Sequence, residues 1–220
     1  MRLKSVFLAI VLMGLLTSPA FAAGRWGHGN WYGPIAMHRG NSTVWQRLGL
    51  DILLASGVTT PGQADPRDTV TPPGGATQAA VACSNRPSNW AGPITHSNWV
   101  SLQADCTTNL SGGTNYTYST TFNLPAVRPG VGIVGRVLAD DSVTIQLNGH
   151  TIMAAGGNLG AASTFYSTDP TVFTAGTNTL TFTVYNVTGP SGLDYVAGIR
   201  TGGGPLFGHL GNHDPDDRGD

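Results

Sequence analysis

The sequence contains no glutamate, and charged residues make up only 10% of its 220 positions. A catalytic pair of carboxylates would have to come from a few scattered aspartates, which disfavours general acid–base hydrolysis. The formal net charge of −1 leaves no basic excess, which argues against nucleic-acid binding. No G-x-S-x-G, H-E-x-x-H or phosphate-cradling glycine motif is present. We therefore expect no enzymatic activity and no catalytic residues.

Long apolar runs are also missing. The longest one, residues 6–16, is too short to span a bilayer. It follows Arg2 and Lys4 and precedes an Ala20-Phe21-Ala22 cleavage pattern, which is the layout of a secretory signal peptide of bacterial type. We expect cleavage after Ala22 and a secreted, extracellular or cell-surface protein without stable membrane insertion.

The sequence has two cysteines, Cys83 and Cys106. In an exported protein such a pair is expected to form a disulfide, worth roughly 3 kcal/mol for a loop of this length. No pattern of histidine and carboxylate accompanies either thiol, so a catalytic cysteine is disfavoured.

Residues 23–76 differ from the rest of the chain, because glycine and aromatic residues are frequent there without a clean period. The spacing of apolar residues predicts a short helix over 43–56. A linker rich in proline and glycine follows from Thr60 to Gly75. The last segment, 203–220, has the composition of a disordered tail.

Residues 77–202 carry the most regular pattern, an alternation of apolar and polar residues typical of half-buried strands. Tyr116 and Tyr195 fall on the apolar side and are expected to point inward. Asn148-Gly149 is a strong hairpin sequence. These features predict an all-β domain, an antiparallel β-sandwich or jelly roll. The alternation covers 116–124, 132–139, 142–147, 150–153, 179–184 and 193–199.

An ordered set of motifs in this domain resembles the galactose-binding-like jelly-roll domains. Such domains occur as non-catalytic modules in glycoside hydrolases and in bacterial exported proteins with a C-terminal sorting signal of the PEP type; that sorting tail is not found here. The resemblance implies a β-sandwich, a sugar- or surface-binding role and a structural calcium ion. The motifs are Ser97-Asn98-Trp99, 116–125, 139–143, Leu147-Asn148-Gly149, Phe173 with 176–180, and 189–193.

Sugar binding requires an aromatic face and polar groups that orient hydroxyls. Tyr166, expected in a loop between Asn158 and Asp169, is the best exposed aromatic candidate. Trp99 is a further candidate, with the alternative that it packs against the core edge. Functional residues of sandwiches gather on loops at one end, and the candidates expected to share one end are Asn148, His150, Asn158 and Tyr166.

Calcium prefers carboxylate and carbonyl oxygens. Asp140 and Asp141 lie between two predicted strands and Asp194 begins the last one, so these three are candidate calcium ligands. The alternative is that Asp140-Asp141 simply makes a turn.

Two functions follow as hypotheses. The first is a secreted, non-catalytic module that binds a carbohydrate, such as a cell-surface or matrix polysaccharide or glycoconjugate. The second is a structural subunit of an extracellular matrix, surface layer or filament. In that case the arm at 24–56 would drive self-assembly, because its tryptophans are costly to leave in water.

Overall fold

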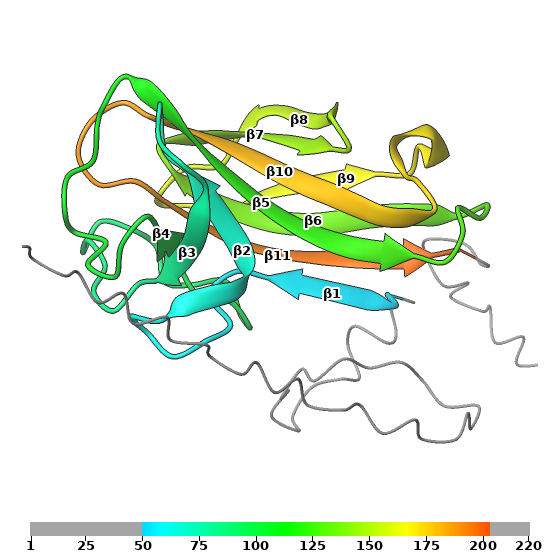
Figure 1. Cartoon of the computed structure of the whole chain (residues 1–220), viewed down its shortest axis with the longest axis horizontal. Helices are drawn as coiled ribbons and strands as arrows, with labels where there is room; N and C mark the ends of the chain where they lie inside the picture. Colours follow the sequence, from blue (N-terminus) through cyan, green and yellow to red (C-terminus); the bar gives the residue numbers. More distant parts are fainter. Residues whose placement is uncertain (1–49, 203–220) are drawn as a thin grey trace, which may run out of the picture. The chain divides into compact units, whose positions relative to one another are not determined.

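The computed structural model describes residues 50–202, which form an antiparallel β-sandwich (Figure 1). Within this range no helix is long and apolar enough to cross a membrane. The predicted signal peptide, residues 23–49 of the arm and the tail at 203–220 lie outside the described residues. The strands are β1 Ile52–Ala55, β2 Ala64–Thr71, β3 Gln78–Ala82, β4 Val100–Ser101, β5 Thr114–Leu124, β6 Val131–Asp140, β7 Ser142–Leu147, β8 His150–Gly156, β9 Ser163–Ser167, β10 Gly176–Asn186 and β11 Gly192–Thr201, with a 3₁₀ helix η1 at Pro170–Val172.

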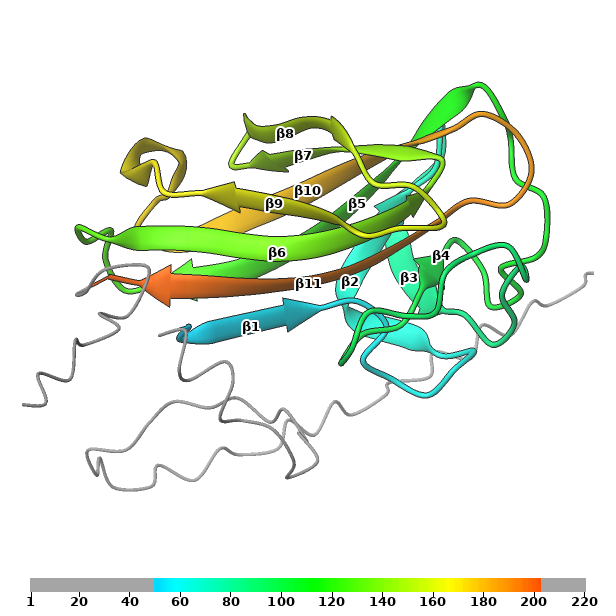
Figure 2. The same cartoon turned by 180° about the vertical axis from the view of Figure 1, so that it is seen from behind.

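The strands lie in two layers that Figures 1 and 2 show from opposite sides. One layer has the order β8-β7-β10-β5-β2-β3, and the other has β9-β6-β11 with β1 along the far side of β11. The short strand β4 pairs with both β3 and β11 and so joins the layers along one side. All named strand pairs are antiparallel, which confirms the predicted fold class.

The core lies between the layers and follows from the alternation in the sequence. On β5 every second side chain from Tyr116 to Leu124 is buried, and Tyr195 on β11 faces them, so both tyrosines point inward as predicted. Phe182 of β10 stacks on Tyr195 with ring centroids 4.4 Å apart and meets Phe165 of β9 edge-on at 6.2 Å. These aromatic contacts hold the two layers together.

The predicted hairpin turn at Asn148-Gly149 is confirmed. Both residues have positive φ, 51° and 83°, as a two-residue turn between β7 and β8 requires. The direction of β7 and β8 then defines two ends of the sandwich. The hairpin end contains 148–149 and 168–175, whereas the disulfide end contains 83–113, 157–162 and 187–191.

A second cluster of buried residues covers the outer face of β6 and β11 at the disulfide end. Trp90, Ile94 and Trp99 come from the irregular segment between β3 and β5 and pack on Leu138 and Val196. Consequently β11 is buried on both faces along nearly its whole length. A strand covered on both sides is expected to consist of apolar or small residues. Residues Leu193–Ile199 have this composition apart from Asp194.

Two predictions about residues before 77 are wrong in their described part. Residues 52–55, expected to end a helix, form strand β1, in which Leu54 is 3% exposed. Pairing with β11 satisfies the backbone of this segment, which overrides a weak helical period. Residues 64–71, expected as linker, form β2 with Val70 fully buried against β5. The sandwich therefore begins well before residue 77.

Candidate functional site

Asn148 builds the hairpin end. Its amide nitrogen donates to the Val172 carbonyl at 3.0 Å and to the Asn178 side-chain oxygen at 2.8 Å. Its own side-chain oxygen accepts from the backbone N–H of Thr179 at 2.9 Å. These bonds tie the β7–β8 turn to η1 and to the start of β10. Asn148 thus positions the surrounding loops, and its polar atoms are largely occupied.

His150 and Asp169 lie exposed at the same end. Asp169 caps η1: its carboxylate accepts from the Thr171 backbone at 2.9 Å and from the Thr171 hydroxyl at 2.7 Å. These hydrogen bonds lower the pKa of Asp169, and the charge of His150 adds a smaller effect in the same direction.

Tyr166 does not lie in a loop, as predicted, but on strand β9, with a side chain that is 68% exposed. β9 ends the sheet path beside β6, where Tyr166 is opposite Val134 and the neighbouring Thr164 is opposite Arg136. Arg136 is also exposed, and cross-strand geometry places it diagonally next to the ring within reach of a long side chain.

Phe165 keeps this strand in place. It points to the other face of β9 and is 2% exposed. Its ring lies over Gly135 of β6, where an added Cβ would come within 2.4 Å of the ring. The exposed ring of Tyr166 is therefore carried by an anchored strand, which keeps the entropy cost of holding it against a ligand low.

Asn158 lies at the disulfide end, so the prediction that it shares an end with His150 is wrong. Strand β8 separates the two residues by its full length. The side-chain oxygen of Asn158 accepts from the backbone N–H groups of Gly160 and Ala161 at 2.8 and 2.7 Å. This is the local turn chemistry of an Asx motif, and it explains why the segment before β9 reverses direction there.

The structure also corrects Trp99 as a ligand-binding candidate, because its side chain is completely buried. Its ring packs against Trp90 with centroids 4.2 Å apart, and its indole N–H donates to the Ala91 carbonyl at 3.0 Å. The alternative in the sequence analysis, packing against the core edge, is the one observed.

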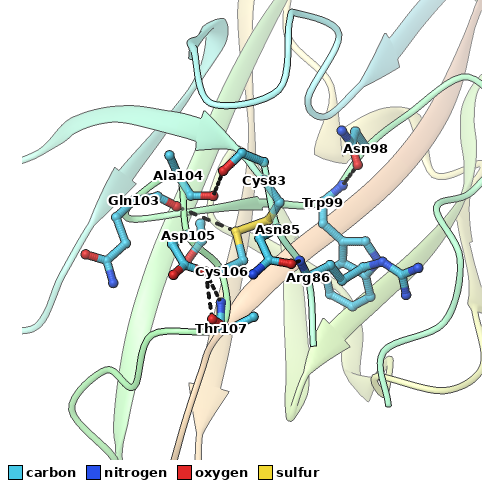
Figure 3. Close-up of a disulfide and its surroundings, with 12 residues drawn as sticks. Cys83, Asn85, Arg86, Asn98, Trp99, Gln103, Ala104, Asp105, Cys106 and Thr107 are labelled. Atoms are coloured by element: carbon cyan, nitrogen blue, oxygen red, sulfur yellow. Dashed lines mark hydrogen bonds between the residues drawn. A yellow bond between two sulfur atoms is a disulfide. The ribbon is translucent and has the colours of Figure 1, made fainter. Parts of the chain in front are cut away.

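The predicted disulfide between Cys83 and Cys106 is confirmed (Figure 3). It joins the residue after β3 to the segment that leads into β5. The backbone N–H of Cys83 donates to the Trp99 carbonyl at 2.8 Å, so the disulfide and the tryptophan pair are parts of one anchored region.

The three aspartates proposed for calcium lie at the disulfide end but have separate tasks. The Trp90 indole N–H donates to Asp140 at 2.7 Å, while Asp141 accepts from the Val187 backbone at 2.7 Å. Burial raises the pKa of Asp140 to about 7, and the neighbouring Asp141 carboxylate adds to this.

Asp194 accepts hydrogen bonds from Ser97, Ser56 and the Ile94 backbone, and burial raises its pKa. Among residues 50–202, no group of three or more His, Cys, Asp or Glu side chains comes together to hold a metal ion. Each of the three carboxylates already accepts a hydrogen bond from the protein. Calcium binding by two of them, with backbone carbonyl oxygens completing the site, stays a prediction.

Arg136 is the residue beside Tyr166 that the sequence analysis missed. Arg136 is the one exposed residue of β6, a strand that is otherwise apolar up to Asp140 at its end. The sequence around Arg136 does not show that Tyr166 lies near it, because the pairing of β6 with β9 depends on the tertiary fold.

No protein-family model matches the chain, and no curated protein matches it in sequence. Similar solved structures include a family 35 carbohydrate binding module from Clostridium thermocellum, with 12% identity, a TM-score of 0.38, and coverage of 69% of this chain and 99% of that one. An FMN-binding β-glucuronidase from Facaelibacterium prausnitzii L2-6 has 15% identity and a TM-score of 0.36 over 66% of this chain. The match spans only 22% of the β-glucuronidase. At TM-scores below 0.5 these likenesses assign neither a ligand nor an activity to the chain.

Proposed function

We propose that this chain is a secreted, non-catalytic carbohydrate-binding protein whose ligand contacts Tyr166. The observation that carries the proposal is the 68% exposed ring of Tyr166 on strand β9, diagonally across from the exposed Arg136. A ring exposed to this extent is free to stack on a ligand and to bury apolar area against it.

The surroundings of the ring suit a sugar. An aromatic face accepts the apolar C–H face of a pyranose, and nearby polar groups bond its hydroxyls. Arg136 supplies donors and Thr164 supplies a hydroxyl that can donate or accept. His150 and Asp169 lie at the hairpin end, toward which β9 runs.

The test is calorimetric titration of the purified chain with soluble gluco-, galacto-, xylo- and uronic-acid-containing oligosaccharides. Tyr166→Ala should weaken binding about tenfold, since a lost ring contact costs roughly 1–2 kcal/mol. Tyr166→Phe keeps the ring and serves as the matched control. A folded wild-type chain that binds no oligosaccharide, or equal binding by Tyr166→Ala, would refute the proposal. Release of reducing ends from any of these sugars would refute its non-catalytic part.

A further inference from the structure

The outer face of the first layer, across β7, β10, β5 and β2, has an unusual composition. In the paired parts of these strands every outward residue is Thr, Ser, Asn or Gln, apart from Tyr185 at the rim. We call this surface the threonine face. Its residues are Ser142, Thr144 and Gln146 of β7, Thr177, Thr179, Thr181 and Thr183 of β10, Asn115, Thr117, Ser119, Thr121 and Asn123 of β5, and Thr69 and Thr71 of β2.

The strand register aligns these side chains into rows across the sheet. Thr144, Thr183, Thr117 and Thr71 form one row of four hydroxyls on four neighbouring strands. The next row consists of Gln146, Thr181, Ser119 and Thr69. Neighbouring side chains are about 4.8 Å apart within a row, and rows are about 7 Å apart along the strands. The result is a regular array of polar groups.

Where β7, β10, β5 and β2 pair with one another, no charged side chain lies on the face. The exposed Arg67 lies on β2 two residues before Thr69, outside the pairing of β2 with β5. The surfaces of soluble domains ordinarily carry roughly a quarter to a third charged residues. The whole chain has only 10% charged residues, so the face shares its low charge with the rest of the protein. What distinguishes the face is the alignment of its hydroxyl and amide side chains into rows across four strands.

The side chains of the face limit the class of partner that could bind there. Protein interfaces are enriched in aromatic residues, methionine and arginine and depleted in serine, and threonine is under-represented among their hot spots. Nucleic acids and anionic membranes need basic groups, which the face lacks. A hydroxyl both donates and accepts, so an array of hydroxyls can pair with other hydroxyls in many orientations. The hydroxyls of Thr69 and Thr144 already donate within the protein, and their lone pairs can still accept from a ligand. The β-branched threonine side chain also has few rotamers to lose on binding.

From these observations we infer that the threonine face is a second, independent surface that binds an extended, uncharged polysaccharide presented as a sheet or bundle. The inference takes its ligand class from the proposed function, but its location is separate from Tyr166. Four strands span about 14 Å, and the five outward positions of β5 span about 27 Å along the strand. An area of this size covers several sugar residues of a fixed chain, whereas the Tyr166 surface offers one ring.

The test is depletion of the purified full chain from solution by microcrystalline cellulose and by chitin. The variant is Thr144→Glu combined with Thr183→Lys. These residues are cross-strand partners, so the new opposite charges face each other. The change also removes the hydrogen bond from the Thr144 hydroxyl to the Ala154 carbonyl at 2.8 Å, so the fold of the variant has to be verified. A charge pair pressed against a neutral solid loses hydration without a partner in the ligand, so the Kd should rise about tenfold or more. Thr183→Val keeps the shape, removes one hydroxyl and should cause a smaller loss.

Thr95→Lys, an exposed threonine between β3 and β4, is the control and should bind as the wild type does. Circular dichroism and thermal unfolding verify that each variant is folded. Equal depletion by wild type and the double variant overturns the inference and leaves the proposed function intact. Failure of the wild type to bind either solid, while soluble oligosaccharides still bind at Tyr166, also overturns the inference alone. Absence of both kinds of binding overturns both proposals.

Discussion

The buried carboxylate of Asp68 should make this protein lose stability as the pH rises from about 4 to 7. Asp68 is 2% exposed and accepts a hydrogen bond from the Tyr195 hydroxyl at 2.8 Å, while its second oxygen has no partner. Burial, with a contribution from the neighbouring Asp65 carboxylate, raises the pKa of Asp68 from 3.8 to about 7. Thr120, on the paired strand β5, is also buried, and its hydroxyl likewise has no partner.

The sign follows from proton linkage. The folded state holds the proton on Asp68 more tightly than the unfolded chain does, so protonation favours folding. The resulting stability is fully present below about pH 4 and is lost as the pH rises through about 7. A pKa of about 7 in place of 3.8 corresponds to about 4 kcal/mol of unfolding free energy across this window. The raised pKa values of Asp140 and Asp194 act in the same direction.

Asp68→Asn is the diagnostic variant, because asparagine has the shape of the protonated acid and cannot ionise. Its amide can donate where the carboxylic acid would, while its oxygen still accepts from Tyr195. Urea unfolding at pH 4.5 and 7.5 should show a clear loss of stability in the wild type and a smaller loss in the variant, which should be the more stable protein at pH 7.5. A wild type equally stable at both pH values would refute the reasoning, as would an unchanged pH dependence in Asp68→Asn.

Two further predictions concern packing and cross-linking. Replacing Cys83 and Cys106 together by alanine should lower the unfolding free energy by about 3 kcal/mol, measured by urea unfolding against the wild type with and without reductant; no change on reduction of the wild type would contradict it. Gly135→Val should destabilise the protein by more than about 2 kcal/mol, since the added Cβ would meet the Phe165 ring and the Val196 carbonyl within 2.6 Å. Gly149→Ala, where an added Cβ meets no atom within 4 Å, is its control and should show only the smaller cost of its positive φ; equal losses in both variants would contradict the packing argument.

The strands that could be predicted are those whose two faces differ. Thr179–Val184 alternates strictly because one face meets the core and the other meets water, and that pattern is local. β9 was missed because it has only one fully buried residue, Phe165, in five positions. β1 was mistaken for helix because it is a short strand added to β11, and its stability comes from pairing with residues nearly 150 positions away.

The candidate site shows the same division. The residue type correctly indicated that the side chain of Tyr166 is exposed and that the two cysteines form a disulfide. The same reasoning failed for Trp99. The segment around it has no regular alternation of apolar and polar residues, so the sequence does not show which of its side chains point inward. It also failed for Asn158, whose distance from His150 depends on the length of β8.

The sequence alone thus determined the all-β class, the inward faces of the long strands, the Asn148-Gly149 turn and the disulfide, because each depends on neighbouring residues or on a single pair of cysteines. The tertiary structure decided which strands are neighbours and in which register. Register brought Arg136 beside Tyr166, aligned the hydroxyls of the threonine face into rows and buried Asp68 under Tyr195. These relations join residues far apart in the chain, and the side-chain period of two in a strand does not specify a partner strand.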